Sequence, residues 1–577
     1  MIRPIEYLVS LNEPQTQTFT VTMLLRNVAS RTLEVALPVW RQGKYAVINP
    51  VSSIRGVSAT TASNHPLEIH KIDKTTWQIQ TDGAPEVVIR YTVYANSLND
   101  RTRHVDDTHA YLSGATVFLY VPSRRRDSVL VRLEAPAGWR VASGLDHAPG
   151  EPRTLLASDY DTLIDSPIEI GDHELVTFDV DGKRHDVAVW GGIPFDSERL
   201  ENDFTKIIQA EAAIFGGLPY DRYVFIVHVA QGIGGGTEHL NSTVIQMSAA
   251  VFENDVHYRN LLSLAAHEMF HTWNVKRLRP SALRNINLAG ENYTDLLWFC
   301  EGTTSYYDEL IVVRAGLQPE EAYLKSLAES IYQYRARPGA LVQSVSESSF
   351  DAWVKFNNPN ADEINATVSY YDSGALASLL LDFEIRRRTR NRASFDTLLR
   401  AMYEAFPASG PGYTSSDLVQ MLNRLTDSEF DEFFDKYIYG ATRYPFEVAF
   451  EVVGLQMIPI DPAPKAYSGL FLQEEGGVCR VRSVLSDGPA YIAGVNAGDE
   501  VVVLNGRRFK AGEINAYIER ALSPGDSVWL QLLRRNRLRR IEFRLGTKPN
   551  SRWELQKVAA PSPEQRAAYE SWLGCAF

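Results

Sequence analysis

The first 172 residues alternate between hydrophobic and polar positions with a period of two. Residues 18–25 (TFTVTMLL) and 86–93 (EVVIRYTV) show the pattern, and turn residues separate such segments. Successive side chains of a strand point to opposite faces, so the alternation predicts half-buried strands. We therefore expect an N-terminal β-sandwich-like domain over residues 1–172.

The pattern changes beyond residue 172. Strand-like segments give way to helical ones, and residues 311–447 are mostly helical, with good examples at 375–388 and 415–425. Apolar positions there recur at the spacing of a helix face. The chain thus predicts a second domain over residues 173–455, with a helical lobe from about residue 311.

A proline-rich linker at residues 458–464 precedes a third type of sequence, and the segment 466–546 resembles a PDZ domain. The resemblance rests on Tyr467-Ser468-Gly469-Leu470-Phe471, on Gly-Pro-Ala at 488–490, where a short helix is expected, and on an Asn-Gly turn at 505–506. It implies that backbone N–H groups of Ser468, Gly469, Leu470 and Phe471 receive a C-terminal carboxylate while the peptide adds as a strand. The alternative is a structural module with an empty groove. Residues 547–577 form a C-terminal extension with an expected helix at 563–573.

Composition excludes several classes of protein. The 577 residues are 45% hydrophobic and 22% charged, with a formal net charge of −13. An acidic chain is a poor general partner for nucleic acid. We find no apolar run long enough to cross a membrane and no apolar signal core at the N-terminus. The three cysteines make no disulfide framework, so we expect a cytoplasmic protein.

The fragment 264–274 (LAAHEMFHTWN) carries the strongest chemical signal. On a helix, His267 and His271 project from one face and suit two nitrogen ligands of a zinc ion. Glu268 would lie beside that metal as a general base acting on water. The simpler interpretation is a helix with two hydrogen-bonded core histidines.

A third ligand is available about thirty residues downstream. Glu301 opens a second helical stretch and is flanked by Trp298, Phe299, Tyr306 and Tyr307, which suits a buried location. A buried carboxylate needs a partner, and a metal provides one. Three protein ligands leave the fourth position of a zinc ion open, as catalysis requires. We therefore expect one zinc ion per chain.

These segments together resemble the glycyl aminopeptidase family of zinc peptidases, gluzincin relatives of aminopeptidase N. The resemblance rests on His-Glu-Met-Phe-His at 267–271, Trp-Asn-Val-Lys-Arg at 273–277, and Trp298 followed by Glu301-Gly302. The run Leu-Pro-Val-Trp-Arg-Gln-Gly-Lys-Tyr at 37–45 is similar to the opening of the family's N-terminal domain. The resemblance implies a multidomain α+β protein with a thermolysin-like catalytic domain.

Two further segments match the family by position. Gly234-Gly235-Gly236-Thr237-Glu238-His239 resembles the Gly-Ala-Met-Glu-Asn segment of aminopeptidase N enzymes. The resemblance implies that an edge strand at Gly235 and Gly236 holds the substrate backbone and that Glu238 binds the free α-amino group. Thr237 and His239 depart from the family pattern. The alternative is a flexible glycine-rich loop.

The second segment, Tyr370-Tyr371-Asp372-Ser373-Gly374-Ala375, resembles the Tyr-x-x-Gly-Ala segment of the same enzymes. On that register Tyr371 supplies the catalytic phenol that donates to the oxyanion. Tyr370 is the neighbour with which it can be confused.

The sequence therefore predicts a zinc aminopeptidase in which His267, His271 and Glu301 hold the metal and Glu268 and Tyr371 are catalytic. The family resemblance implies a preference for a small N-terminal residue, glycine or alanine. Two alternatives stay open. A zinc endopeptidase could use the PDZ domain to capture substrate tails, and a non-catalytic scaffold could bind peptides in the PDZ groove and keep the metal for structure.

Overall fold

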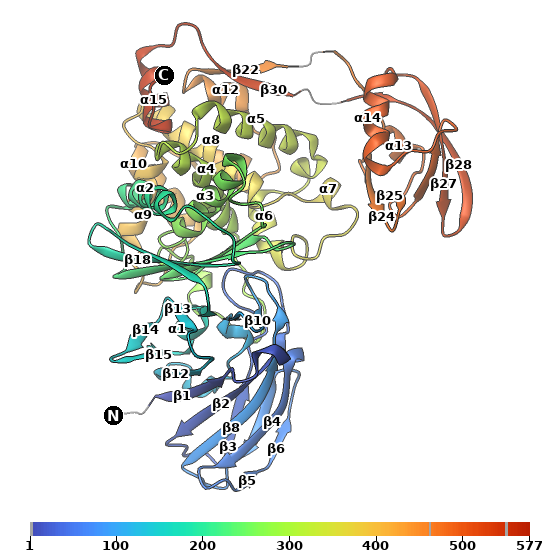
Figure 1. Cartoon of the computed structure of the whole chain (residues 1–577). Coiled ribbons are helices and arrows are strands. Elements are labelled where there is room, and N and C mark those ends of the chain that lie inside the picture. Colours follow the sequence, from blue (N-terminus) through green and yellow to red (C-terminus); the bar gives the residue numbers. More distant parts are fainter. Residues whose placement is uncertain (1–3, 461–462, 549–551) are drawn as a thin grey trace. The chain divides into compact units, whose positions relative to one another are not determined.

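A computed structural model describes residues 4–460, 463–548 and 552–577 (Figure 1). The chain divides into two compact units. The first comprises residues 1–293, 307–317 and 399–414, and the second comprises residues 294–306, 318–398 and 415–577. Residues 461 and 462 of the expected linker lie outside the described residues. Among the described helices, none combines the length and apolar character that a membrane crossing requires.

The N-terminal part of the first unit is built from β-sheets, as the alternation predicted. In β2 (Thr18–Arg26) and β8 (Glu86–Tyr94) alternate residues are buried, and the two strands pair antiparallel. They are inner strands of an eight-stranded sheet in the order β14-β15-β12-β1-β2-β8-β4-β5. Its other strands are β14 (Asp146–Ala148), β15 (Glu151–Ala157), β12 (Val129–Glu134), β1 (Ile5–Ser10), β4 (Ile54–Thr61) and β5 (Pro66–Leu67).

Two smaller sheets complete this part. The order β3-β7-β6 gives a three-stranded sheet from Thr32–Ala36, Thr76–Gln80 and Ile69–Lys71. The order β13-β16-β11-β10-β9 gives a five-stranded sheet from Arg140–Ser143, Ile168–Gly171, His109–Leu112, Arg103–Val105 and Asn96–Ser97. The short helix α1 (Tyr160–Ile164) precedes β16, where the sequence changes pattern.

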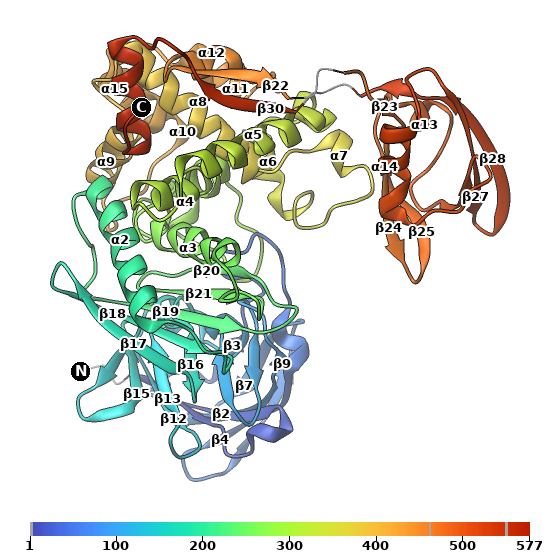
Figure 2. The same cartoon turned by 45° about the horizontal axis from the view of Figure 1, so that its top comes forward.

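The rest of the first unit carries the zinc-motif helix on a mixed sheet. The strand order is β17-β18-β19-β21-β20, with β18, β19 and β21 parallel and the short β20 antiparallel at one edge. The strands are Glu174–Val180, Lys183–Trp190, Arg222–Val229, Ser242–Met247 and Gly235–Glu238. Helices α2 (Ser197–Phe215) and α3 (Asp255–Phe270) lie side by side above this sheet (Figure 2).

The second unit contains the expected helical lobe. Its main helices are α5 (Glu320–Ala336), α6 (Val345–Phe350), α7 (Glu363–Ala366), α8 (Asp372–Thr389), α10 (Ser415–Thr426), α11 (Asp431–Tyr437) and α12 (Phe446–Glu451). Helix α4 (Thr303–Arg314) and helix α9 (Phe395–Ala405) each begin in this unit and end in the first. The 375–388 and 415–425 predictions are confirmed, with each helix slightly longer than expected.

The C-terminal residues return to the helical lobe. Strand β30 (Trp553–Lys557) pairs antiparallel with β22 (Leu455–Pro459), which precedes the linker. Helix α15 (Pro563–Leu573) covers the predicted range and buries Trp572, whose indole donates to the Tyr306 hydroxyl at 3.0 Å. Residues 466–547 therefore stand as an insertion between β22 and β30, rather than being followed by a separate extension.

The inserted module has its own hydrophobic core, which includes Val481, Leu504, Ile514 and Leu530. Its five-stranded sheet has the order β24-β25-β26-β27-β28, from Leu470–Glu475, Val478–Val484, Glu500–Leu504, Ser527–Arg534 and Arg537–Arg544. Helices α13 (Pro489–Ile492) and α14 (Ala511–Ala521) complete it, with β23 (Ala466–Tyr467) paired to β29 (Gly546–Thr547). Figure 2 shows α14 beside β24.

Candidate metal centre and substrate-binding edge

Helix α3 brings the two motif histidines together. Asn254 caps its first turn by accepting hydrogen bonds from two backbone N–H groups, and good helix formers follow. His267 lies in the last turn and His271 directly follows the helix as its C-cap, with helical backbone angles. The Nε2 atoms of the two imidazoles lie 3.2 Å apart. The predicted spacing therefore places both rings as the motif requires, although the second histidine ends the helix instead of lying inside it.

Each histidine is oriented through its other ring nitrogen. The Nδ1 atom of His271 lies 2.9 Å from the backbone oxygen of Asn274, and the Nδ1 atom of His267 lies 3.5 Å from Oδ2 of Asp308. Contacts of this kind fix the tautomer and rotation of a metal-binding imidazole and leave Nε2 available to a metal. Sequence reasoning missed both partners. The carboxylate at 308 lies seven residues after Glu301 but carries no motif of its own.

The predicted third ligand lies in an unusual turn. Glu301 is buried in a π-helical segment, Trp298–Gly302, which leads directly into α4. A wide turn of this kind is frequent at functional sites. Glu301 belongs to the second unit, and the two motif histidines belong to the first.

Tyr371 starts a helix that packs against this turn. It stands at the N-cap position of α8, and its ring centroid is 4.7 Å from that of Tyr370. The two backbones approach closely at Gly302 and Gly374, because a Cβ atom on Gly302 would lie 2.5 Å from the Gly374 Cα atom. Within the second unit, the turn that carries Glu301 therefore lies against the start of the helix that carries Tyr371.

Glu268 faces the glycine-rich segment. A Cβ atom on Gly236 would lie 2.2 Å from Oε1 of Glu268, so the carboxylate rests directly on the backbone of β20. Strand β20 is a true strand and forms the edge of its sheet, which rules out the flexible-loop alternative. An edge strand offers backbone groups to an added strand. The general base candidate and the edge strand of the sheet are thus adjacent.

Glu238 ends the same strand and lies in a basic environment. It is 4% exposed, and a Cβ atom on Gly43 (φ +80°) would lie 2.6 Å from its Oε2 atom. Ligand atoms of Glu238, Glu268 and His271 lie within 4.8 Å of one another. Arg41, two residues before Gly43, is buried and attracts Glu238, while burial lowers the pKa of this arginine. Glu238 therefore has both an acidic neighbour, Glu268, and a basic one, Arg41.

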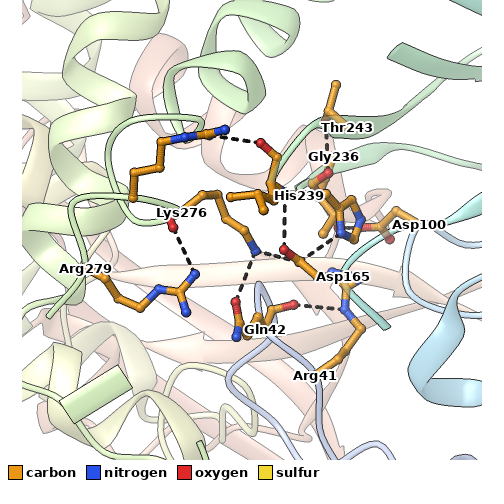
Figure 3. A network of polar contacts seen from close by, with 12 residues as sticks. Arg41, Gln42, Asp100, Asp165, Gly236, His239, Thr243, Lys276 and Arg279 are labelled. Atoms are coloured by element: carbon orange, nitrogen blue, oxygen red, sulfur yellow. Dashed lines mark hydrogen bonds and ion pairs between the residues drawn. The ribbon is translucent and has the colours of Figure 1, made fainter. Parts of the chain in front are cut away.

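An ion pair contacts the residue that follows β20 (Figure 3). The Lys276 ammonium lies 2.6 Å from Oδ1 of Asp165 and 3.1 Å from Oε1 of Gln42, and His239 Nδ1 lies 3.3 Å from the same carboxylate. Burial would raise the pKa of Asp165, but Lys276 and His239 hold it below its ordinary value. Arg101 adds a hydrogen bond to the Gly236 oxygen at 3.3 Å.

A cavity of about 340 Å³ is lined by residues of the module and by Tyr332 and Ile364 of helices α5 and α7. Its lining includes Ser468, Leu470 and Phe471 from the predicted carboxylate loop and Asn515 from α14. Gly469 has φ +82°, which a tight turn at this loop requires. Asn515 donates to the Leu470 oxygen at 2.9 Å and lies 3.2 Å from the Ser468 hydroxyl. One side chain therefore bridges β24 and α14 where a peptide would enter.

The chain resembles a solved structure along almost its whole length. The chain is similar to the aminopeptidase N family protein from Idiomarina loihiensis, with a TM-score of 0.91 and 27% identity over 99% of this chain and 100% of that chain. The M1 zinc metallopeptidase from Deinococcus radiodurans shares 13% identity with a TM-score of 0.48, over 77% of this chain and 95% of that one. Fold and similarity together define a peptidase.

Domain comparisons give the particular family. The peptidase M61 N-terminal domain matches residues 6–172, and the M61 glycyl aminopeptidase domain matches residues 260–377. The chain belongs to the M61 glycyl aminopeptidase family. A curated relative, serine protease Do-like HtrB from Bacillus subtilis, is 29% identical over 104 residues. That match spans 17% of this chain and 23% of the relative's length.

Proposed function

We propose that this peptidase is a zinc-dependent aminopeptidase that removes a small N-terminal residue, glycine or alanine, from peptides. The observation that carries the proposal is the position of Glu268. It follows the first motif histidine directly, and its carboxylate rests on the edge strand β20 beside Gly236. A base held between a metal site and a strand-binding edge is placed to act on a peptide bond.

The residues fit a zinc ion by chemistry and spacing. Two imidazoles and a carboxylate are a usual donor set for catalytic zinc. Two nitrogens at tetrahedral positions around zinc lie about 3.3 Å apart, which follows from the usual zinc–nitrogen distance. The 3.2 Å between the Nε2 atoms of His267 and His271 agrees with that value. We propose His267, His271 and Glu301 as the ligands.

When bound there, zinc would supply Lewis acidity, polarising the scissile carbonyl and making water more acidic. The chain's own groups do the remaining work. A substrate adds as a short strand beside β20, where Gly235 and Gly236 allow its backbone to approach. Glu268 takes a proton from the attacking water and delivers it to the leaving amine. Tyr371 donates its phenolic hydrogen to the oxyanion.

Glu238 makes the enzyme an exopeptidase in this proposal. A carboxylate at the end of β20 can accept hydrogen bonds from the α-ammonium group of a substrate. An internal peptide segment has no such group, so it would lose this contact. The opposite assignment, a zinc endopeptidase, needs no amine anchor at this position.

We also propose that the inserted module is a PDZ domain. Its supporting features are the strand β24 next to α14 and the loop at Ser468 to Phe471 that lines the cavity. A peptide carboxylate entering this groove would displace the Asn515 contacts. The alternative, a structural module with a closed groove, predicts that C-terminal peptides do not bind at all.

The proposal is tested with unblocked and N-acetylated glycyl and alanyl dipeptides, with and without a chelator. An aminopeptidase cleaves the unblocked substrates, loses activity on chelation and recovers it on zinc addition. Cleavage of acetylated substrates at comparable rates would favour the endopeptidase. No cleavage by the zinc-loaded protein of these dipeptides, or of longer peptides with an N-terminal glycine or alanine, would contradict both and favour the scaffold.

A further inference from the structure

A second cluster of metal-binding side chains lies outside the site described above. It consists of His104 on β10, Asp106, His109 on β11, Glu169 on β16 and His228 on β19. These residues form two overlapping groups that share His109: one with His104 and Asp106, the other with Glu169 and His228. The potential ligand atoms of each group lie within 4.8 Å of one another. None of them belongs to the proposed catalytic machinery.

Glu169 fixes the tautomer of two rings. Its Oε1 atom lies 2.9 Å from Nδ1 of His109, and its Oε2 atom lies 3.0 Å from Nε2 of His228. All three residues are fully buried. A carboxylate buried between two ring nitrogens accepts a hydrogen bond from each. Both facing ring nitrogens must then carry hydrogen.

This assignment leaves the lone pair of His109 on Nε2, the ring nitrogen that does not contact Glu169. In the neutral form, which is the form that binds a metal, an imidazole has one donor and one acceptor nitrogen, so Nε2 of His109 is the atom available to an ion. That atom is buried and has no hydrogen-bond partner among the described residues. The ring cannot turn easily, because it stacks on Trp190 with centroids 3.7 Å apart. A histidine with one nitrogen on a carboxylate and the other bare is the arrangement of a metal ligand.

His104 and Asp106 are the two partly exposed members of the group with His109. Nε2 of His104 lies 3.1 Å from Oδ2 of Asp106, and the His104 and His109 ring centroids are 5.0 Å apart. The other carboxylate oxygen of Asp106 accepts from the Thr108 backbone and hydroxyl, at 2.8 and 2.7 Å. Nδ1 of His104 is a second buried nitrogen with no partner in the described part of the chain.

We propose that His104, Asp106 and His109 bind a second divalent metal ion, with zinc as the matching ion. Two imidazoles and one carboxylate are donors of the kind that zinc takes in proteins. The side chains of His104 and Asp106 are 12% and 32% exposed, which leaves a path for the ion and room for water in the remaining positions. Glu169 holds the His109 ring in place through its Nδ1 hydrogen.

The position of the cluster indicates a structural role. Strands β10 and β11 belong to the five-stranded sheet of the N-terminal part, while His228 lies on the central strand β19 of the sheet that carries α3. Through Glu169 the proposed ion is connected to both sheets within the first unit. An ion that binds only the folded state raises its stability. The expected zinc content of the chain rises from one to two.

Metal analysis of the full chain tests the site independently of catalysis. In the His267→Ala/His271→Ala double variant, loaded with zinc and desalted, about one zinc per chain should remain. Adding His104→Ala should remove it, whereas adding His70→Ala, at an exposed histidine, should not. Asp106→Asn keeps the acceptor for the Thr108 turn and should also lose the ion, with the circular dichroism spectrum unchanged.

A second readout is the melting temperature of the double variant. A chelator should lower it when His104 is present and have no effect when His104 is replaced. The proposal is overturned if the double variant holds no zinc, or if the His104→Ala addition leaves its zinc content unchanged. Either outcome leaves the catalytic proposal intact, because that proposal depends on His267, His271 and Glu301 alone.

Discussion

At the scale of single residues, Glu268 and His271 belong to one motif but have different tasks. His271 presents Nε2 toward the Nε2 atom of His267, while Glu268 turns toward Gly236. A residue that acts only as a base should be removable without loss of the metal. The proposal therefore predicts that substitutions of the two residues differ in their effect on metal content, although both lower the activity.

Glu268→Gln should keep the zinc content of the wild type while kcat falls by about a hundredfold to ten-thousandfold, the usual contribution of a general base. His271→Ala should lose activity and one zinc per chain. The check is zinc analysis beside steady-state kinetics on glycyl dipeptides. Loss of zinc from the Glu268 variant would mean that this carboxylate is itself a ligand.

Tyr371 and Tyr370 provide a matched pair for the oxyanion donor. Tyr370 is 1% exposed and Tyr371 is half-buried, and their rings lie side by side. Tyr371→Phe removes one donor and almost no volume, so kcat should fall by about a hundredfold or more with little change in KM. Tyr370→Phe should be close to wild type. The reverse result would move the catalytic tyrosine by one position.

The sequence brings His267, Glu268 and His271 together, because a short motif fixes their relation over one helical turn and the C-cap that follows it. It could not predict Asp308 or the Asn274 carbonyl, which orient the two rings. Those contacts depend on where α4 and the turn after α3 come to lie, and no local pattern encodes that. The basic surroundings of Glu238 were missed for the same reason, since Arg41 is nearly two hundred residues away.

At the scale of elements, β20 and the π-helical turn shape the site. The glycine run predicted close approach of a substrate backbone, and β20 lies at the edge of its sheet, where such an approach is sterically possible. The π-helical turn at Trp298–Gly302 was expected only as the opening of a helix. A local widening of this kind has no periodic signature in the sequence. It depends on the packing of Gly302 against Gly374.

Gly236 provides the test of the edge strand. An alanine Cβ there would collide with the Glu268 carboxylate, whereas Gly234 has open space around it and no unusual φ. Gly236→Ala should lower kcat/KM by about a hundredfold, since displacing a catalytic group by an ångström costs that much. Gly234→Ala should be nearly neutral. Equal kinetics for the two variants would show that Glu268 does not need its place on β20.

At the scale of the whole molecule, the order of domains along the chain was predictable. The contacts between segments far apart in the sequence were not. Turn residues and a proline-rich stretch marked the inserted module. The pairing of β30 with β22 was not foreseen, because two short strands nearly a hundred residues apart share no sequence pattern. The same limit applies to the Asp165–Lys276 pair, which joins the end of the N-terminal domain to the segment after α3.

Asp165→Asn should lower the free energy of unfolding by about 3–5 kcal/mol at neutral pH, because it leaves the buried Lys276 ammonium without its counter-charge. The pKa of Asp165 is depressed in the fold. Its contribution is therefore complete above the unfolded value, about 3.9, and is lost as the pH falls further. The difference between wild type and variant should shrink below about pH 4.

Chemical denaturation at several pH values measures this difference. Asp221→Asn is the matched control, because Asp221 pairs with Lys183 at a comparable distance of 2.7 Å but is fully exposed. It should leave the free energy of unfolding almost unchanged at every pH. An Asp165 variant as stable as the wild type would show that this pair does not hold the two domains together.

The most direct test of the central claim compares free and N-acetylated glycyl or alanyl dipeptides on the wild type and on Glu238→Ala. If Glu238 binds the α-ammonium group, the variant should lose about ten- to a hundredfold in kcat/KM on free dipeptides, as expected for a charge-assisted hydrogen bond. Acetylated substrates should be poor for both proteins, and zinc content should not change. Equal losses on free and acetylated substrates, or efficient cleavage of acetylated peptides by the wild type, would contradict the aminopeptidase assignment.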